Sequence, residues 1–288
     1  MRLIKLFLFL LILGPSCWAQ VNIQNYTPSI LLDRGEFEIK SFQNLYTQTK
    51  SFGNSAFEKV KIPSGRQTYF TSINQVTFGL NDRINFGWDV WIKNVNYADP
   101  NLNPRTGISA TGPRIKVNPF KNLGRFSIQS SFLLPIASDL EAPLVDQGGP
   151  FPFLEFDRNL WLTQLFYDLP LNDQFQLFFQ QAFWYSLVKR SFRQNNFWQT
   201  QSSVFLSYFP SNRWTLYGMT EYFPTHYDDQ EQKFKAFNKY FVQSGLGAKY
   251  QLILNTLELE LLYTNFWAGS TAEGAGHTFN LGIRYIHQ

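Results

Sequence analysis

The residues best suited to interact with a solute are charged or aromatic side chains on every second position of short segments. The stretch "RINFGWDVWIK", residues 83–93, shows the pattern, because Asp89, Trp91 and Lys93 alternate with apolar residues. Opposite charges in a confined wall could bind or screen a solute, or could pair with one another and fill the space. The full candidate set is Asp89, Trp91, Lys93, Lys116, Glu221, Lys249, Glu258, Glu260 and Arg284.

Residues suited to catalysis or metal binding are few. The three histidines are His226, His277 and His287. The sequence has no G-x-S-x-G motif, no phosphate-binding loop and no dinucleotide motif. No group of His, Asp and Glu has the spacing of a metal site, so no cofactor is expected. A hydrolase that uses His226 or His277 as a base is kept as a third hypothesis.

The candidate residues lie on segments that alternate between apolar and polar side chains, and a period of two predicts β-strands. Twelve such segments are expected, at residues 35–49, 66–80, 83–97, 113–120, 125–137, 158–169, 174–188, 196–209, 213–223, 238–252, 256–267 and 277–287.

The connections between these segments alternate in length. Short turns of about two to four residues follow the second, fourth, sixth, eighth and tenth strands, and longer loops follow the others. Outer-membrane barrels show this alternation, with short periplasmic turns and longer extracellular loops. A β-sandwich has no reason for it. We therefore predict an all-β fold, a transmembrane antiparallel up-and-down barrel of about 12 strands, whose longest loop, 138–157, could fold inward.

The N-terminus reads as a secretory signal peptide over residues 1–19. Arg2 and Lys5 precede an apolar run, and small residues precede a cut before Gln20. A lipoprotein acylated at Cys17 is the alternative, although Gly14 stands where that signal has an aliphatic residue. Residues 20–34 are expected to form a periplasmic segment, and residues 35–288 the barrel.

The composition suits a membrane barrel. Aromatic residues make up 18% of the chain and charged residues 16%, against a usual charged share of about 25%. No apolar run beyond the signal reaches the length of about 18 residues that a transmembrane helix needs. The formal charge of +4 falls to +2 once Arg2 and Lys5 are removed. The sequence has no basic cluster that would indicate nucleic-acid binding.

In a barrel, the two faces of each strand meet lipid and lumen. Five residues of the opening stretch are expected to face lipid: Ile84, Phe86, Trp88, Val90 and Ile92. Lys249, Glu258, Glu260 and Arg284 lie on three neighbouring strands and should converge near the short-turn end. Strand 35–49 has a mixed pattern, and a β-bulge between Ile39 and Phe42 would explain its change of phase.

Two stretches resemble a known family. "RFSIQSSFLLPIASDLE", residues 125–141, resembles outer-membrane barrels of the meta-pathway phenol-degradation type, in which an amphipathic strand ends in L-P-x-G before a long loop. Leu134 and Pro135 match this motif, while Ala137 replaces the glycine. "LLDRGEFEIKSFQNLYTQT" is similar to the first strand of uncharacterised relatives in Gram-negative bacteria. The resemblance implies passage or uptake of small, often hydrophobic solutes.

The last strand, "HTFNLGIRYIHQ", resembles an outer-membrane insertion signal, with Ile283 and Tyr285 on one face, although it ends in Gln288 instead of an aromatic residue. It implies contact with the barrel-assembly machinery and residence in the bacterial outer membrane, with outer-membrane lipid around the wall.

Three hypotheses of function follow. The first is a narrow channel or passive transporter for small solutes, with the candidate set lining its lumen. The second is a structural or partner-binding barrel with a plugged lumen. The hydrolase is the third.

Overall fold

The computed structural model describes residues 29–99, 102–137, 139, 154, 158–187, 196–227 and 239–288. The predicted signal peptide lies outside these residues. The strands are β1 (Phe37–Gln48), β2 (Lys50–Phe52), β3 (Lys59–Lys61), β4 (Gln67–Asn81), β5 (Ile84–Tyr97), β6 (Arg105–Val117), β7 (Phe126–Pro135), β8 (Asn159–Pro170), β9 (Phe175–Leu187), β10 (Phe197–Tyr208), β11 (Trp214–Tyr227), β12 (Lys239–Ile253), β13 (Leu257–Gly269) and β14 (His277–His287).

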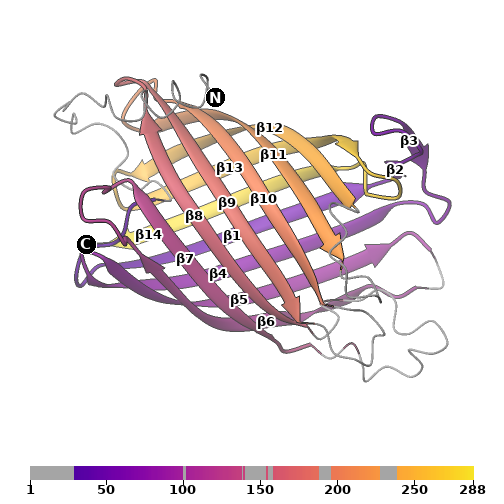
Figure 1. Cartoon of the computed structure of the whole chain (residues 1–288), viewed down its shortest axis with the longest axis horizontal. Coiled ribbons are helices and arrows are strands. Elements are labelled where there is room, and N and C mark those ends of the chain that lie inside the picture. Colours follow the sequence, from indigo (N-terminus) through magenta and orange to yellow (C-terminus); the bar gives the residue numbers. More distant parts are fainter. Residues whose placement is uncertain are drawn as a thin grey trace, which may run out of the picture.

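Twelve of these strands close into one antiparallel barrel (Figure 1). Chain order is kept around the wall, and β1 closes the barrel by pairing with β14 on one side and with β4 on the other. The strands β2 and β3 form a separate hairpin. The predicted all-β, up-and-down barrel of twelve strands is confirmed. Among the residues that the structure describes, no helix is long and apolar enough to cross a membrane.

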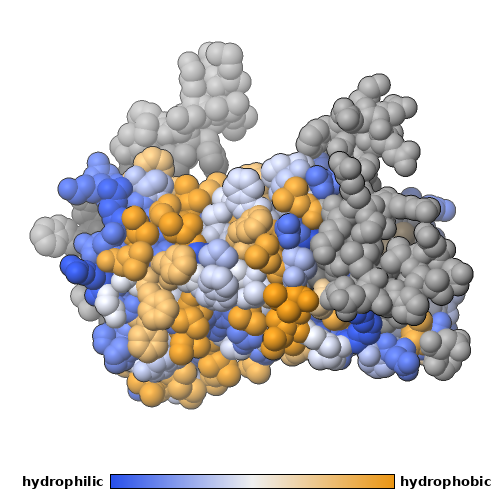
Figure 2. Space-filling view, turned by 90° about the horizontal axis from the view of Figure 1, so that it is seen from below, coloured by the Kyte–Doolittle hydropathy of each residue, from blue (hydrophilic) through white to orange (hydrophobic). Residues whose placement is uncertain are grey.

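The outer wall of the barrel is apolar. On β5, Phe86 and Trp88 are 44% and 48% exposed, whereas Asn85 and Asp89, which flank this pair, are each 2% exposed. Large hydrophobic side chains gather on the outer face shown in Figure 2. Apolar residues outside and polar residues inside are the pattern of barrels whose wall is solvated by lipid.

Strand β6 begins at Arg105, whereas the sequence pattern placed its start at residue 113. Its first half is built mainly from small residues, so it carries little apolar alternation. Its partner β5 nevertheless pairs along this half as far as Val95 opposite Arg105, across a register shift at Trp91 and Ile92. Pairing with a long neighbour thus extends a segment that its own sequence would leave as a loop.

The bulge expected in β1 is absent, because its pairings with β4 and β14 run without a register shift. Strict alternation therefore places Phe42 on the inner face with Glu38, and Ser41 and Gln43 on the outer face. The two outer polar side chains are hydrogen bonded: Gln43 Nε2 donates to Ser41 Oγ at 2.8 Å, and Ser41 Oγ donates to Asn74 Oδ1 of β4 at 2.7 Å.

At the end with longer connections, the β2–β3 hairpin packs on the rim. Phe52 is 1% exposed and packs with Phe266 and Ala275. Lys59 Nζ donates to the carbonyl oxygen of Phe266 at 2.6 Å. Burial, reinforced by the neighbouring charge of Lys50, lowers the pKa of Lys59.

Of the loop 138–157, the structure describes Asp139 and Leu154. Both are buried, and the backbone N–H of Leu154 donates to the Asp139 carboxylate at 3.1 Å. Arg105 Nη1 lies 2.6 Å from Asp139 Oδ1, so this carboxylate links Leu154 to the start of β6. The rest of the loop lies outside the described residues.

Candidate functional site in the barrel lumen

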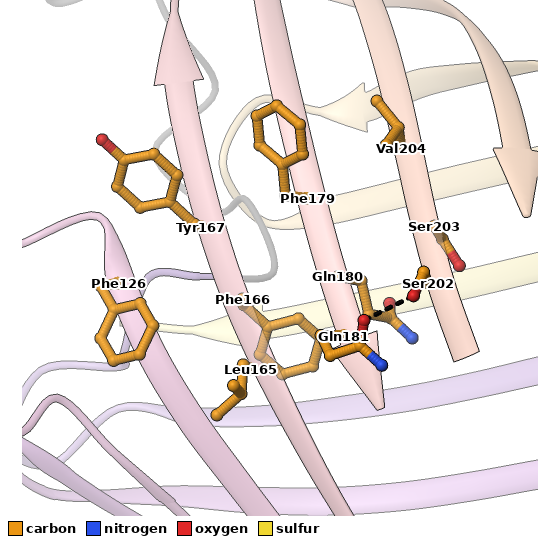
Figure 3. Close-up of a pocket in the computed structure, with 10 residues that line it drawn as sticks. All are labelled: Phe126, Leu165, Phe166, Tyr167, Phe179, Gln180, Gln181, Ser202, Ser203 and Val204. Carbon is orange, nitrogen blue, oxygen red and sulfur yellow. Dashed lines mark hydrogen bonds between the residues drawn. The ribbon is translucent and has the colours of Figure 1, made fainter. Parts of the chain in front are cut away.

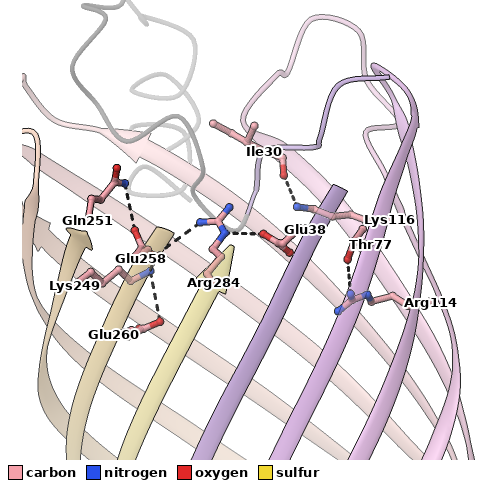
Figure 4. Close-up of polar contacts among 10 residues, drawn as sticks. All are labelled: Ile30, Glu38, Thr77, Arg114, Lys116, Lys249, Gln251, Glu258, Glu260 and Arg284. Atoms are coloured by element: carbon pink, nitrogen blue, oxygen red, sulfur yellow. Dashed lines mark hydrogen bonds and ion pairs between the residues drawn. The ribbon is translucent and has the colours of Figure 1, made fainter. Parts of the chain in front are cut away.

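A cluster of charged side chains from β1, β12, β13 and β14 lies inside the barrel near the short-turn end (Figure 4). Lys249 Nζ lies 3.8 Å from carboxylate oxygens of both Glu258 and Glu260. Arg284 lies 2.6 Å from Glu38 and 3.9 Å from Glu258. The cause is register, because Glu260 is directly opposite Lys249 and Glu258 is directly opposite Arg284. The structure thus brings together four candidate residues from three strands.

The members of this charged cluster are not fully enclosed. The side chains of Lys249, Arg284 and Glu38 are 19%, 15% and 18% exposed. Glu260 is 17% exposed and also accepts a hydrogen bond of 2.5 Å from the Tyr217 hydroxyl. Water-accessible space therefore lies along the inner face of β12, β13, β14 and β1.

Sequence reasoning missed two residues of the charged cluster, Glu38 and Lys40. Both lie on the inner face of β1, where Glu38 pairs with Arg284 and Lys40 is directly opposite Arg284 in the ladder. The pattern Phe37-Glu38-Ile39-Lys40 does alternate. The polar residues Ser41 and Gln43 on the outer face obscured this alternation. Only the pairing of β1 with β14 shows that Glu38 and Lys40 lie beside Arg284.

Asp89 and Arg114 form a second, drier ion pair on β5 and β6. Arg114 Nη1 lies 3.3 Å from Asp89 Oδ1, and the two side chains are only 4% and 3% exposed. Ser131 Oγ donates to Asp89 Oδ2 at 3.1 Å, and Arg114 Nη2 donates to Thr77 Oγ1 at 2.5 Å. Arg114 was not among the candidate residues, although its place two residues before Lys116 puts it on the same face.

Replacing Arg114 by alanine is expected to destabilise the barrel by about 3–5 kcal/mol, because it leaves the Asp89 carboxylate buried without its cation. The measurement is the urea midpoint of unfolding in detergent, read from the mobility shift between folded and heated protein in gels. The double variant Asp89→Asn, Arg114→Leu is the control and should recover most of the loss. Equal losses in both variants would contradict this account.

Trp91 lies in the packed half of the lumen. It is 6% exposed and packs with Ala110, Leu133 and Leu160, which come from β6, β7 and β8. Its ring also meets Trp184 of β9 edge-on, with centroids 6.2 Å apart. Because β5 and β9 are separated by three strands, this contact crosses the interior of the barrel. Trp91 therefore narrows the lumen on the side of β5 to β9.

Aromatic rings continue around the inner wall from Trp184. Successive neighbours have centroids between 4.8 and 6.3 Å apart. In order they are Trp184, Phe223, Phe241, Phe266, Tyr46, Tyr69 and Tyr97. We refer to these seven residues as the aromatic series. It gives the lumen a surface on which flat apolar groups can stack.

Two of the remaining candidate residues, Lys93 and Glu221, lie apart from the charged cluster. Lys93 Nζ lies 6.0 Å from the ring of Trp91. Glu221 is 6% exposed and accepts hydrogen bonds from three donors: Gln201, Ser203 and Gln243. Its carboxylate is thus held by amides and a hydroxyl.

Lys116 contacts the segment that precedes β1. Its Nζ donates to the backbone carbonyl of Ile30 at 2.5 Å and lies 5.9 Å from the ring of Phe166. The neighbouring Ser29 is fully buried, and its hydroxyl donates to the carboxylate of Asp168 on β8. Leu32 is 4% exposed. The described part of the predicted periplasmic segment therefore lies inside the short-turn end of the barrel.

None of the three histidines contacts the charged cluster among the residues that the structure describes. His277 belongs to the outer face of β14, where its Nδ1 lies 2.7 Å from the hydroxyl of Tyr263. The ring of His287 lies 5.0 Å from that of Phe37 at the end of the chain. His226 is opposite Trp198 on the outer face of β11, and the acids that follow it lie outside the described residues. Within the described residues, no group of three or more His, Cys, Asp and Glu could hold a metal ion.

The barrel's closed wall, apolar outside and polar interior define the chain as a protein of the outer-membrane β-barrel class. No protein-family model matches the sequence, and no curated protein matches it. Solved structures do match the fold of this chain. The COG4313 outer membrane channel from Pseudomonas putida F1 superimposes with a TM-score of 0.63 at 12% identity, over 91% of this chain and 98% of that one.

Two further solved structures match with lower scores. The translocator domain of autotransporter NalP from Neisseria meningitidis has a TM-score of 0.48 at 12% identity, over 88% of this chain and 89% of that one. The KdgM porin has a TM-score of 0.44 at 10% identity, over 86% and 99%. At these identities, the likeness to the Pseudomonas putida channel establishes a shared fold.

Proposed function

We propose that this protein is an outer-membrane channel through which small solutes diffuse along a narrow lumen. The observation that carries the proposal is the uneven exposure of the inner wall. The pair Asp89 and Arg114 is almost completely buried, whereas Lys249, Glu260 and Arg284 keep between 15% and 19% of their side-chain surface exposed. The proposed path therefore follows the inner face of β12, β13, β14 and β1.

The path offers two kinds of surface to a solute. Near the short-turn end, the charged cluster would act on ions and polar groups over a few ångströms of confined water, where Coulomb interactions are stronger than in bulk. Nearer the longer connections, the aromatic series would stack flat apolar groups. The resemblance of residues 125–141 to phenol-degradation barrels also favours small, hydrophobic solutes.

The test is planar-bilayer recording with the purified full-length protein, together with swelling of liposomes in small sugars and small aromatic acids. We expect discrete conductance steps, and uptake that falls steeply as solute size increases. The variant Gly79→Val should be recorded beside it. A Cβ at Gly79 would lie 1.9 Å from the backbone oxygen of Asp33, so the variant should displace the segment that lies inside the short-turn end and open the lumen. The proposal would be contradicted if neither protein conducted ions in the bilayer and neither allowed the liposomes to swell.

The alternative is a structural or partner-binding barrel with a plugged lumen. The packing of Trp91 against Leu133 and Leu160, both at most 2% exposed, favours it. This alternative expects no conductance from either protein, and a partner that remains bound through purification.

A further inference from the structure

The β2–β3 hairpin places two lysines directly opposite each other at the end of the barrel with longer connections. Lys50 of β2 pairs with Lys61 of β3, and both side chains are exposed. Figure 1 shows the hairpin beyond the ends of the wall strands. Directly opposite residues of an antiparallel pair have Cβ atoms about 4.5–5.5 Å apart, and like charges in these positions destabilise the pair. The hairpin therefore holds two positive charges that repel each other.

A third lysine lies on the same face of the hairpin. Lys59 is directly opposite Phe52, two residues along each strand from the pair Lys50 and Lys61, and side chains two residues apart share a face. The Nζ of Lys59 lies 5.7 Å from the centre of the Phe52 ring. Burial, and after it the charge of Lys50, lowers the pKa of Lys59. The positive charge on this face is therefore shared by three neighbouring side chains.

The backbone of β2 is hydrogen bonded on both edges. One edge pairs with β3, and the other bonds to the segment that precedes β14. There the N–H of Phe52 donates to the carbonyl oxygen of Glu273 at 2.8 Å, and the N–H of Ala275 donates to that of Lys50 at 3.0 Å. Phe52 is 1% exposed. This anchoring keeps Lys50 and Lys61 opposite each other, so the backbone cannot move to relieve their repulsion.

No described carboxylate neutralises the two lysines. Neither Lys50 nor Lys61 forms an ion pair with another residue in the part of the chain that the structure describes. Two acids lie on the adjoining segments, and both have other contacts. The Glu58 carboxylate accepts a backbone N–H of its own turn at 3.0 Å, and the Glu273 carboxylate lies 3.8 Å from Lys239 Nζ. The two ammonium groups are therefore open to an anion from outside the chain.

We propose that Lys50 and Lys61 form a binding site for a phosphate group or a similar oxyanion, with Lys59 beside them as a third positive charge. Each ammonium group donates charge-assisted hydrogen bonds to such an anion, and these bonds are roughly twice as strong as neutral ones. An anion between the two lysines replaces their repulsion by two attractive contacts. The pocket in Figure 3 offers no such charge, because none of the residues that line it is basic.

Two sources can supply the phosphate group. One is phosphate or a phosphorylated solute in the medium, and the other is the phosphorylated headgroup of a lipid around the barrel. Lys50 and Lys61 recognise the same chemistry in both cases. The site lies at the end of the barrel opposite the charged cluster, so it goes beyond the proposed channel and does not depend on it.

The first test is binding of inorganic phosphate to the purified full-length protein in dodecyl maltoside, a detergent without phosphate. Calorimetric titration at low ionic strength, where surface charges are least screened, should show binding that weakens as salt is added. Phosphate should also slow the acetylation of Lys50 and Lys61 several-fold, as measured by mass spectrometry. Lys121, which is exposed in the β6–β7 turn at the other end, is the internal control and should react at the same rate with and without phosphate.

The second test changes the charge of one lysine. Lys61→Glu converts the repulsive pair into an attractive one, so the variant should fold at least as well as the native protein. It should nevertheless bind phosphate about tenfold or more weakly, because the anion then meets a carboxylate. Lys61→Arg keeps the charge and should keep the binding, and Lys121→Gln is the control for net charge. Heat-modified gel mobility checks the fold. Unchanged phosphate affinity in a folded Lys61→Glu variant would overturn the proposal.

The third test identifies the source of the phosphate. Acetylation of Lys50 and Lys61 is measured in the same detergent after adding lipopolysaccharide, whose sugar headgroup carries phosphates, or its dephosphorylated form. Protection by the intact lipid alone, and not by the dephosphorylated form, supports the site and assigns it to a lipid headgroup. Protection by inorganic phosphate alone supports the site and assigns it to a free anion. Acetylation that neither phosphate nor the intact lipid slows would overturn the site.

Discussion

Replacing Trp91 by alanine is expected to raise the single-channel conductance about twofold or more, because it removes one of the largest side chains that narrow the lumen. A barrel of twelve strands lies between eight-stranded barrels, which side chains fill, and the 16- to 18-stranded porins with open channels. Trp91 reaches over Ala110 and Leu133 to meet Trp184 on the far side of this half of the lumen. Without the indole, β5 and β9 face each other across open space. Bilayer recordings in the Gly79→Val background, which is expected to be open, measure the change directly.

The same substitution should cost stability. Loss of a buried Trp side chain destabilises a protein by about 3–5 kcal/mol when the cavity does not collapse, and a closed barrel wall resists collapse. The control is Trp88→Ala on the same strand. Trp88 is 48% exposed on the outer wall and donates from Nε1 to Thr111 Oγ1 at 2.7 Å. It should leave the conductance unchanged, and an equal rise from both variants would contradict the assignment of Trp91 to the constriction.

The sequence predicts the strands well because alternate residues of a membrane barrel face two different environments, lipid outside and the polar interior inside. Along 83–93, lipid selects Phe86 and Trp88 while the interior selects Asn85 and Asp89, so the period of two is sharp. The pattern fails where a wall residue is small or polar, as at the start of β6 and at Ser41 in β1. There the neighbouring strands, and not the local sequence, determine the structure.

The contacts inside the lumen were harder to predict. They depend on the pairing of the first strand with the last, and on contacts between residues far apart in the sequence. Glu258 opposite Arg284 follows from a hairpin, since β13 and β14 are consecutive strands that pair antiparallel. Glu38 beside Arg284 joins residues 246 positions apart and requires β1 to meet β14. The hold of Lys116 on Ile30 depends on a segment with no periodicity at all, so no sequence signal announced it.

Neutralising two carboxylates of the charged cluster is expected to make the channel prefer anions. The inner side chains Lys40, Lys249 and Arg284 carry three positive charges, and Glu38, Glu258 and Glu260 carry three negative ones. In the double variant Glu258→Gln, Glu260→Gln the balance becomes three positive charges against one negative. An unscreened charge about 4 Å from a confined ion is worth about 4 kcal/mol at an effective dielectric constant of 20, so even a screened remainder should shift the permeability ratio several-fold.

The measurement is the reversal potential in a tenfold salt gradient, again in the Gly79→Val background. Lys249→Gln is the matched opposite, because it leaves two positive charges against three negative ones and should move the reversal potential toward cations. Asp82→Asn in the exposed β4–β5 turn changes the charge by the same unit outside the lumen and should have little effect. Shifts of the same sign in the double variant and in Lys249→Gln would mean that ions do not pass the charged cluster. The path would then lie along the half of the lumen where Trp91 and Leu133 are packed, which is the half that the Trp91→Ala experiment opens.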